Sequence, residues 1–234
     1  MTIRPPTEIG MAADDVDTPA LLVDLDAFEH NIALMARMVA SFGVNHRPHA
    51  KTHKSPDVAR RQIAAGAVGQ CCQKVGEAEV LVAGGIEDVL VSNQVVGPRK
   101  LDRLAALARQ ASIGVCVDDA GNIEDINAAA KRFGSTVEVL VEVDIGAGRC
   151  GVMPGAPAVE LAKKIDAASN LKFGGLQAYQ GRAQHIRGHG ERKVAIDKAG
   201  ALVKETVAKL TAAGLDGRLV TGAGTGTFQF EARS

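Results

Sequence analysis

Short apolar runs alternate along the chain with longer stretches in which apolar residues recur every three or four positions. The run 137–143 shows the first pattern, because valine occupies every second position and alternating β-branched residues favour a strand. The second pattern predicts helices with one apolar face. Its clearest example consists of Phe28, Ile32, Met35, Val39 and Phe42.

The two patterns together predict a regular alternation of strands and helices. The predicted strands are at residues 20–24, 44–50, 68–72, 87–92, 112–117, 137–143, 173–179 and 218–222. The predicted helices are at residues 27–42, 55–65, 76–84, 98–110, 121–133, 157–168 and 191–213. Such an alternation implies parallel strands with helical crossovers, so the fold class is α/β, either a (β/α)₈ barrel or an open doubly wound sheet.

Residue types at the predicted helix ends agree with this assignment. Asp26 is the expected N-cap of the first helix and Gly43 its expected C-cap. Ser55 is the expected N-cap of the second helix.

Composition excludes several classes of protein. The chain of 234 residues has 27 Lys and Arg against 27 Asp and Glu, which argues against a nucleic-acid partner. It has no apolar run long enough to span a bilayer, so no membrane partner is expected. None of its four cysteines forms a CxxC pair, and a reducing cytoplasm is the expected location.

The domain organisation is expected to be simple. Residues 1–16 are polar and are interpreted as a loose N-terminal segment, and residues 17–234 as one domain. The last predicted strand runs into a glycine-rich loop after which no helix is predicted. Either the fold closes in an unusual way or the chain is a fragment.

The segment Arg47 to Lys54, RPHAKTHK, is the first candidate for chemistry. It lies at the C-terminal end of a predicted strand, and in parallel α/β folds the active site lies at the carboxyl ends of the strands. Alternation places His49, Lys51 and His53 on one side and Ala50 and Thr52 on the other. An inward lysine among other cations would be held neutral, as Schiff-base chemistry requires. The competing interpretation is a solvated surface loop, and a further alternative makes His49 and His53 metal ligands.

Other predicted strand ends carry polar residues. Arg149 follows the acids Glu142 and Asp144 and would contact a carboxylate or a ring nitrogen, or instead form a structural ion pair with Asp144. Tyr179, the only tyrosine, would stack on a ring or serve as a buried core aromatic. The loop 221–227, TGAGTGT, is expected to cradle a phosphate or to be a flexible turn.

These motifs together resemble the fold-type III pyridoxal-phosphate enzymes, and among them the D-threonine aldolase and 3-hydroxyaspartate aldolase family. The resemblance covers nearly the whole chain from Asp17 onward. It is carried by RPHAKTHK, CCQKVGEAE, VEVDIGAGRCGV, LQAYQG and TGAGTGT, in this order. The segments CCQK and AYQG favour the 3-hydroxyaspartate aldolase branch.

The resemblance implies an alanine racemase-like TIM-type barrel that binds pyridoxal phosphate. Lys51 would hold the cofactor as a Schiff base, Arg149 would face the pyridine nitrogen, and His49 would take part in proton transfer. The other implied cofactor-binding residues are Gln73, Asn93, Tyr179, Thr221, Gly222, Ala223 and Gly224. In this family the strand at 20–24 lies outside the barrel.

The implied activity is that of a carbon–carbon lyase. Retro-aldol cleavage would convert 3-hydroxyaspartate to glycine and glyoxylate, or D-threonine to glycine and acetaldehyde. The family also uses a divalent metal, Mg²⁺ or Mn²⁺, whose ligands would lie beyond Ser234. The chain would thus be truncated, with seven barrel strands and without the eighth strand and the C-terminal β domain. The full-length protein is expected to be a homodimer that acts on a small hydroxy amino acid.

Three alternatives stay open at this stage. An amino-acid racemase or a hydroxy-amino-acid dehydratase would use the same barrel, because one fold hosts several chemistries. A pyridoxal-phosphate carrier would bind the cofactor without turnover. A metal hydrolase on an unrelated barrel would use His49 and His53 as ligands and no cofactor.

Overall fold

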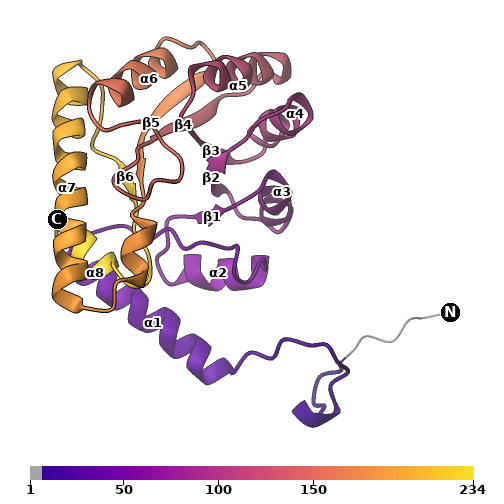
Figure 1. The fold of residues 1–234 in the computed structure, drawn as a ribbon. Coiled ribbons are helices and arrows are strands. Elements are labelled where there is room, and N and C mark those ends of the chain that lie inside the picture. The colour runs from indigo at the N-terminus through magenta and orange to yellow at the C-terminus, as the bar shows by residue number, and fades with distance from the viewer. Residues whose placement is uncertain (1–6) are drawn as a thin grey trace.

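The computed structural model describes residues 7–234, which form a parallel sheet covered by helices on its outer face (Figure 1). The strands are β1 (Gln70–Cys72), β2 (Asp88–Gln94), β3 (Ser112–Val117), β4 (Val137–Glu142), β5 (Leu171–Ala178) and β6 (Val220–Gly222). The helices are α1 (Leu25–Phe42), α2 (Pro56–Ala64), α3 (Val75–Ala83), α4 (Pro98–Leu107), α5 (Ala120–Phe133), α6 (Ala156–Asp166), α7 (His189–Ala212) and α8 (Phe228–Glu231). Two 3₁₀ turns, η1 (Ala13–Asp15) and η2 (Gly181–His185), complete the described elements.

The strands lie in the sheet in the same order as in the sequence, and all neighbouring pairs are parallel. A helix connects each strand to the next, and helices α2 to α6 fan around the outside of the curved sheet (Figure 1). Strands β1 and β6 are the two outer strands, so the sheet forms an open half-barrel. This arrangement confirms the predicted α/β barrel architecture with an incomplete barrel.

Two predicted strands are wrong. Residues 20–24 form no strand and lie outside the described sheet, as the resemblance implied, and Leu21 is 98% exposed. Residues 44–50 reduce to one parallel bridge between His49 and Cys71. The described sheet therefore has six strands rather than seven. β-branched and apolar residues favour a strand only where a neighbouring strand supplies hydrogen-bond partners, and Pro48 has no N–H to donate.

The sheet has two differently built faces. Alternate valines of β2, β3 and β4 point to the helices and are completely buried in the main apolar core. These are Val89, Val91, Val115, Val117, Val139 and Val141. The opposite, inward face has a small apolar cluster of Cys71, Leu90, Cys116 and Leu140. The strand alternation therefore positions every second strand residue toward the interior of the half-barrel.

Helix ends agree with the prediction except at one position. The side chain of Asp24, and not Asp26, caps α1 by accepting a hydrogen bond from Ala27 N at 2.8 Å. Gly43 ends α1 in the left-handed conformation, with φ 68°. Ser55 caps α2 by accepting from Val58 N at 3.4 Å.

The end of the chain differs from the expectation that no helix follows the glycine-rich loop. The single-turn helix α8 follows it and packs beside α1, with the rings of Phe42 and Phe228 6.5 Å apart. At the other end, the predicted loose segment 1–16 lies partly outside the described residues, and its remainder contains η1. The domain boundary at residue 17 stays a prediction. Within residues 7–234, no helix has both the length and the hydrophobicity to cross a bilayer.

Candidate active site at the carboxyl ends of the strands

Lys51 lies just beyond the bridge that pairs His49 with Cys71, at the carboxyl end of β1. Backbone hydrogen bonds fix this segment against β1, because Ala50 N donates to Cys71 O and Cys71 N donates to Pro48 O, both at 2.7 Å. The Lys51 side chain is exposed, so the prediction that Lys51 is buried in the interior is wrong. The half-barrel is open next to β1, and the amine therefore reaches solvent.

His49 is held between Lys51 and β2. Its Nδ1 accepts a hydrogen bond from Lys51 N at 3.3 Å, so Nε2 carries the proton and donates to Ser92 Oγ at 3.3 Å. Ser92 Oγ in turn donates to Cys72 O at 3.4 Å. Burial, and then the nearby Lys51 charge, lower the pKa of His49 to about 4. The imidazole is thus neutral at neutral pH, and both ring nitrogens are engaged.

Gln73 and Asn93 come together at the ends of β1 and β2. Asn93 Nδ2 donates to Gln73 O at 3.3 Å, and Gln73 N donates to Glu77 Oε2 at 2.8 Å. Asn93 directly follows Ser92, the hydrogen-bond partner of His49. The predicted residues of this part of the site therefore form one group around Lys51.

A buried carboxylate at the end of β4 organises the next group. Glu142 is only 4% exposed, and its two oxygens accept hydrogen bonds from three side chains. Gln94 Nε2 donates to Oε2 at 2.7 Å, Cys150 Sγ to Oε1 at 2.9 Å and Arg149 Nη2 to Oε1 at 3.3 Å. Burial and the bond to Glu142 raise the pKa of the Cys150 thiol.

Arg149 pairs with Glu142, and not with Asp144 as one sequence interpretation proposed. Asp144 instead closes the turn, because its Oδ1 accepts from Gly146 N at 2.9 Å and from Gly148 N at 3.0 Å. These N–H groups, that of Gly148 above all, lower the pKa of Asp144. The Arg149 guanidinium lies over the ring of Tyr179, 5.6 Å from its centroid.

The glycine-rich loop after β6 has a strongly constrained backbone. Gly222 lies so close to β5 that a Cβ there would be 1.8 Å from Ala178 O. Ala223 has φ 72°, a left-handed turn of the kind that gathers successive N–H groups around an anion. Gln184 braces the loop, since its Oε1 accepts from Gly226 N at 2.8 Å and its Nε2 donates to Thr227 Oγ1 at 2.6 Å.

The predicted site residues thus lie in three groups on one rim of the sheet. The Lys51 group and the Arg149 group are linked across the interior by the bond from Gln94 to Glu142. The glycine loop is linked to the second group through the strand register, in which Thr221 pairs with Gln177, two residues before Tyr179. Among residues 7–234, no side-chain hydrogen bond or ion pair joins Lys51 directly to the loop.

Several residues of the site lack a strong sequence signal. Ser92 and Gln94 follow Leu90 at two-residue steps along β2. Because Leu90 points inward, strand alternation alone indicates that Ser92 and Gln94 point inward too. Gln184 braces a loop more than 30 residues away, and no local pattern indicates such a partner. The metal-ligand interpretation of His49 and His53 is weakened, since His53 Nδ1 already accepts from Ser55 N at 3.1 Å.

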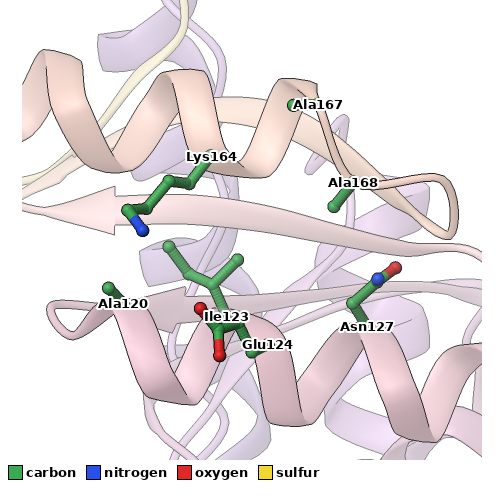
Figure 2. A pocket seen from close by; sticks show the side chains of 7 residues that line it. All are labelled: Ala120, Ile123, Glu124, Asn127, Lys164, Ala167 and Ala168. Atoms are coloured by element: carbon green, nitrogen blue, oxygen red, sulfur yellow. The ribbon is translucent and has the colours of Figure 1, made fainter.

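The hollows on the described surface include one away from the strand ends and one at them. One lies between α5 and α6 and measures about 210 Å³ (Figure 2). There Lys164 extends from α6 toward α5, where Ala120, Ile123 and Glu124 line the facing side (Figure 2). The other, of about 180 Å³, lies at the strand ends beside Arg149 and Tyr179. The second hollow shares Arg149 and Tyr179 with the candidate site, and the first shares none of its residues.

A parallel half-barrel with a lysine, an arginine and a glycine-rich loop on its carboxyl rim belongs to the class of barrel folds whose sites lie at the strand ends. The family model for the alanine racemase N-terminal domain matches residues 23–233. The chain belongs to this family.

Individual relatives narrow the similarity further. The chain is 49% identical over 227 residues to a 3-hydroxy-D-aspartate aldolase of Paracoccus denitrificans, covering 96% of this chain and 59% of the relative. It is 44% identical over 234 residues to a D-threonine aldolase of an Arthrobacter species, covering 100% of this chain and 62% of the relative.

A solved structure agrees in fold. The crystal structure of D-threonine aldolase from Filomicrobium marinum superimposes with a TM-score of 0.96 at 52% identity, covering 98% of this chain and 62% of that one. The chain therefore spans 59–62% of the length of these three relatives.

Proposed function

We propose that this chain is the pyridoxal-phosphate-binding part of an aldolase that cleaves a 3-hydroxy amino acid. The substrate would be 3-hydroxyaspartate, giving glycine and glyoxylate, or D-threonine, giving glycine and acetaldehyde. The observation that carries the proposal is the exposed Lys51 amine on the same strand-end rim as the Arg149–Tyr179 pair and the glycine loop. The names of the three relatives support the same reaction class.

The residues of the rim fit pyridoxal phosphate. Ala223 at φ 72° forms the kind of turn that receives a phosphate, and Lys51 offers an accessible primary amine. The guanidinium of Arg149 is oriented over Tyr179 and anchored on Glu142. When bound, the cofactor supplies an electron sink for cleavage of the Cα–Cβ bond.

Each predicted residue then has a proposed role. Lys51 would hold the cofactor covalently, and Arg149 would lie at the pyridine nitrogen and keep it unprotonated. Thr221, Gly222, Ala223 and Gly224 would bind the phosphate, while Gln73, Asn93 and Tyr179 would contact the cofactor. His49 is retained as a proton acceptor, because its neutral ring is next to Lys51, although it must first release the Lys51 N–H.

The divalent metal expected from the resemblance has no binding site among the described residues. No cluster of three or more His, Cys, Asp or Glu among residues 7–234 is arranged to hold a metal ion. The described residues do not fit this group, and no step is assigned to it. A homodimer and a cytoplasmic location likewise stay predictions, and the four free cysteines are consistent with a reducing compartment.

Borohydride reduction of the protein with pyridoxal phosphate tests the proposal. We expect an absorption band that disappears on reduction and a label on the Lys51 peptide in mass spectrometry. Lys51→Ala should abolish the label and lower turnover by at least about 10⁴-fold. Lys54→Ala is the matched control, since it removes an exposed lysine three residues away. This variant should retain both the label on Lys51 and the turnover.

Product analysis separates the alternatives. Cleavage gives glycine and an aldehyde or glyoxylate, dehydration gives a keto acid and ammonia, and racemisation gives only the enantiomer. Bound cofactor without any product would favour the carrier. A protein that is folded by circular dichroism and still shows no label would contradict the whole proposal.

A further inference from the structure

The hollow beside Arg149 and Tyr179 has an unusual lining. Six residues surround it: Ala147, Arg149, Tyr179, Gly181, Arg182 and His185. Two of them carry guanidinium groups and one an imidazole, and none is an acid. Its volume of about 180 Å³ is sufficient for a small polar group but not for a whole cofactor. A hollow with this lining favours a small anion.

Arg182 reaches this hollow because two turns are fitted together. Gly148 has φ 59°, and a Cβ at this position would lie 3.0 Å from Arg182 Nη2. The glycine therefore leaves the space that the guanidinium occupies. Gln180 ties the same two turns, since its Oε1 accepts from Arg182 N and its Nε2 donates to Ile145 O, both at 3.2 Å.

Arg182 forms no ion pair with Asp144. Asp144 attracts the guanidinium, but its oxygens already accept the N–H groups of Gly146 and Gly148. Among residues 7–234, no ion pair joins Arg182 to a carboxylate, whereas Arg149 has Glu142. Arg182 thus keeps its planar set of donors for a partner from outside the chain.

We propose that this hollow is the subsite for the second carboxylate of a dicarboxylic hydroxy amino acid, with Arg182 as the main binding residue and His185 as the second. The inference rests on the proposed function and names its substrate class. A guanidinium binds a carboxylate through two parallel hydrogen bonds, which a methyl group cannot accept. The subsite therefore selects 3-hydroxyaspartate over D-threonine, and Arg149 and Tyr179 connect it to the proposed cofactor.

Kinetics with both substrates test this selection. Arg182→Gln should lower kcat/KM for 3-hydroxyaspartate about 10- to 100-fold, mainly through KM, and that for D-threonine less than about threefold. Arg182→Lys should give an intermediate loss, since it keeps the charge without the fork. Arg187→Gln is the control, because it removes an exposed arginine of the same segment that does not line the hollow. Equal losses for the two substrates would overturn the subsite.

Ligand binding tests the subsite without turnover. Succinate and butyrate differ by one carboxylate, and calorimetry with and without pyridoxal phosphate compares their affinities. We expect succinate to bind more tightly than butyrate, and Arg182→Gln and His185→Gln to reduce this preference. Equal affinities in the native protein would overturn the inference even if the aldolase is active. Succinate selectivity in a protein without lyase activity would support the anion subsite and contradict the proposed function.

Discussion

The outer and inner faces of the sheet are built from the same strands but differ in the polarity of their side chains. The outer face is a continuous layer of fully buried valines against the helices. The inner face changes character along each strand. Ion pairs of Arg47 with Asp88, at 2.6 Å, and Lys172 with Glu138, at 3.2 Å, lie toward the amino ends, and the small apolar cluster comes next.

The carboxyl end of the inner face is the polar layer of the candidate site. His49, Ser92, Gln94 and Glu142 lie there and are joined in pairs by hydrogen bonds. The difference shows that the two faces serve different purposes, since apolar burial on the outside stabilises the fold. The inside carries polar groups that are costly to bury and are satisfied by one another.

The largest contrast is expected from two matched truncations. Leu104→Ala removes a side chain that is 1% exposed in the outer core, and Leu140→Ala one that is 3% exposed in the inner cluster. We expect a loss of about 3–5 kcal/mol for Leu104→Ala and about 2–3 kcal/mol for Leu140→Ala, because the open interior relaxes more easily around the cavity. Urea denaturation measures both. Equal losses would mean that the inner cluster stabilises the fold as strongly as the outer core.

A smaller effect should distinguish the two ends of the inner face. Glu142→Ala leaves Gln94 and Arg149 without their acceptor and should lower the free energy of unfolding by about 1–3 kcal/mol. Glu138→Ala removes the carboxylate at the opposite end of the same strand, where its partner Lys172 is exposed. We expect this control to change stability by less than about 1 kcal/mol. A reversed order in urea denaturation would show that the amino-end ion pairs matter more.

The smallest effect is the pH dependence of the polar layer. Burial lowers the pKa of His49 from 6.5 to about 4, so the unfolded chain binds more protons between these values. The contribution of His49 to stability is therefore complete above pH 6.5 and is lost as the pH falls toward about 4. Solvent reaches the half-buried ring, which keeps the effect small. His49→Asn should flatten part of this slope in unfolding experiments.

The ring itself provides an independent check. In NMR, the His49 resonances of the folded protein should titrate with a midpoint well below that of an exposed histidine. The variant retains His46 and His53, whose pKa values burial also lowers, so some slope should persist. A midpoint near 6.5 would contradict the buried, hydrogen-bonded geometry.

Local patterns were sufficient to predict the alternation of strands and helices from β1 onward, and the position of Arg149 and Tyr179 after the strands β4 and β5. The strand predicted before Lys51 is reduced to one bridge. Buried positions recur along a helix or strand at the period of that element, so the spacing of apolar residues shows which face is buried. The prediction of helices α2 to α7 was accurate to within a few residues for this reason. The proposed roles of the site residues stay predictions.

Partnerships between distant segments were decided only by the tertiary structure. Residues 20–24 have the composition of a strand but meet no neighbouring strand in the described sheet, so their pattern alone misled. Arg149 forms an ion pair with Glu142 and not with Asp144, whose carboxylate accepts hydrogen bonds from the backbone of the glycine turn. Arg182 reaches the hollow because Gly148, from another turn, leaves room for it. Spacing along a chain carries no information on which side chains meet in space, and these contacts form only when the sheet brings the strand ends together.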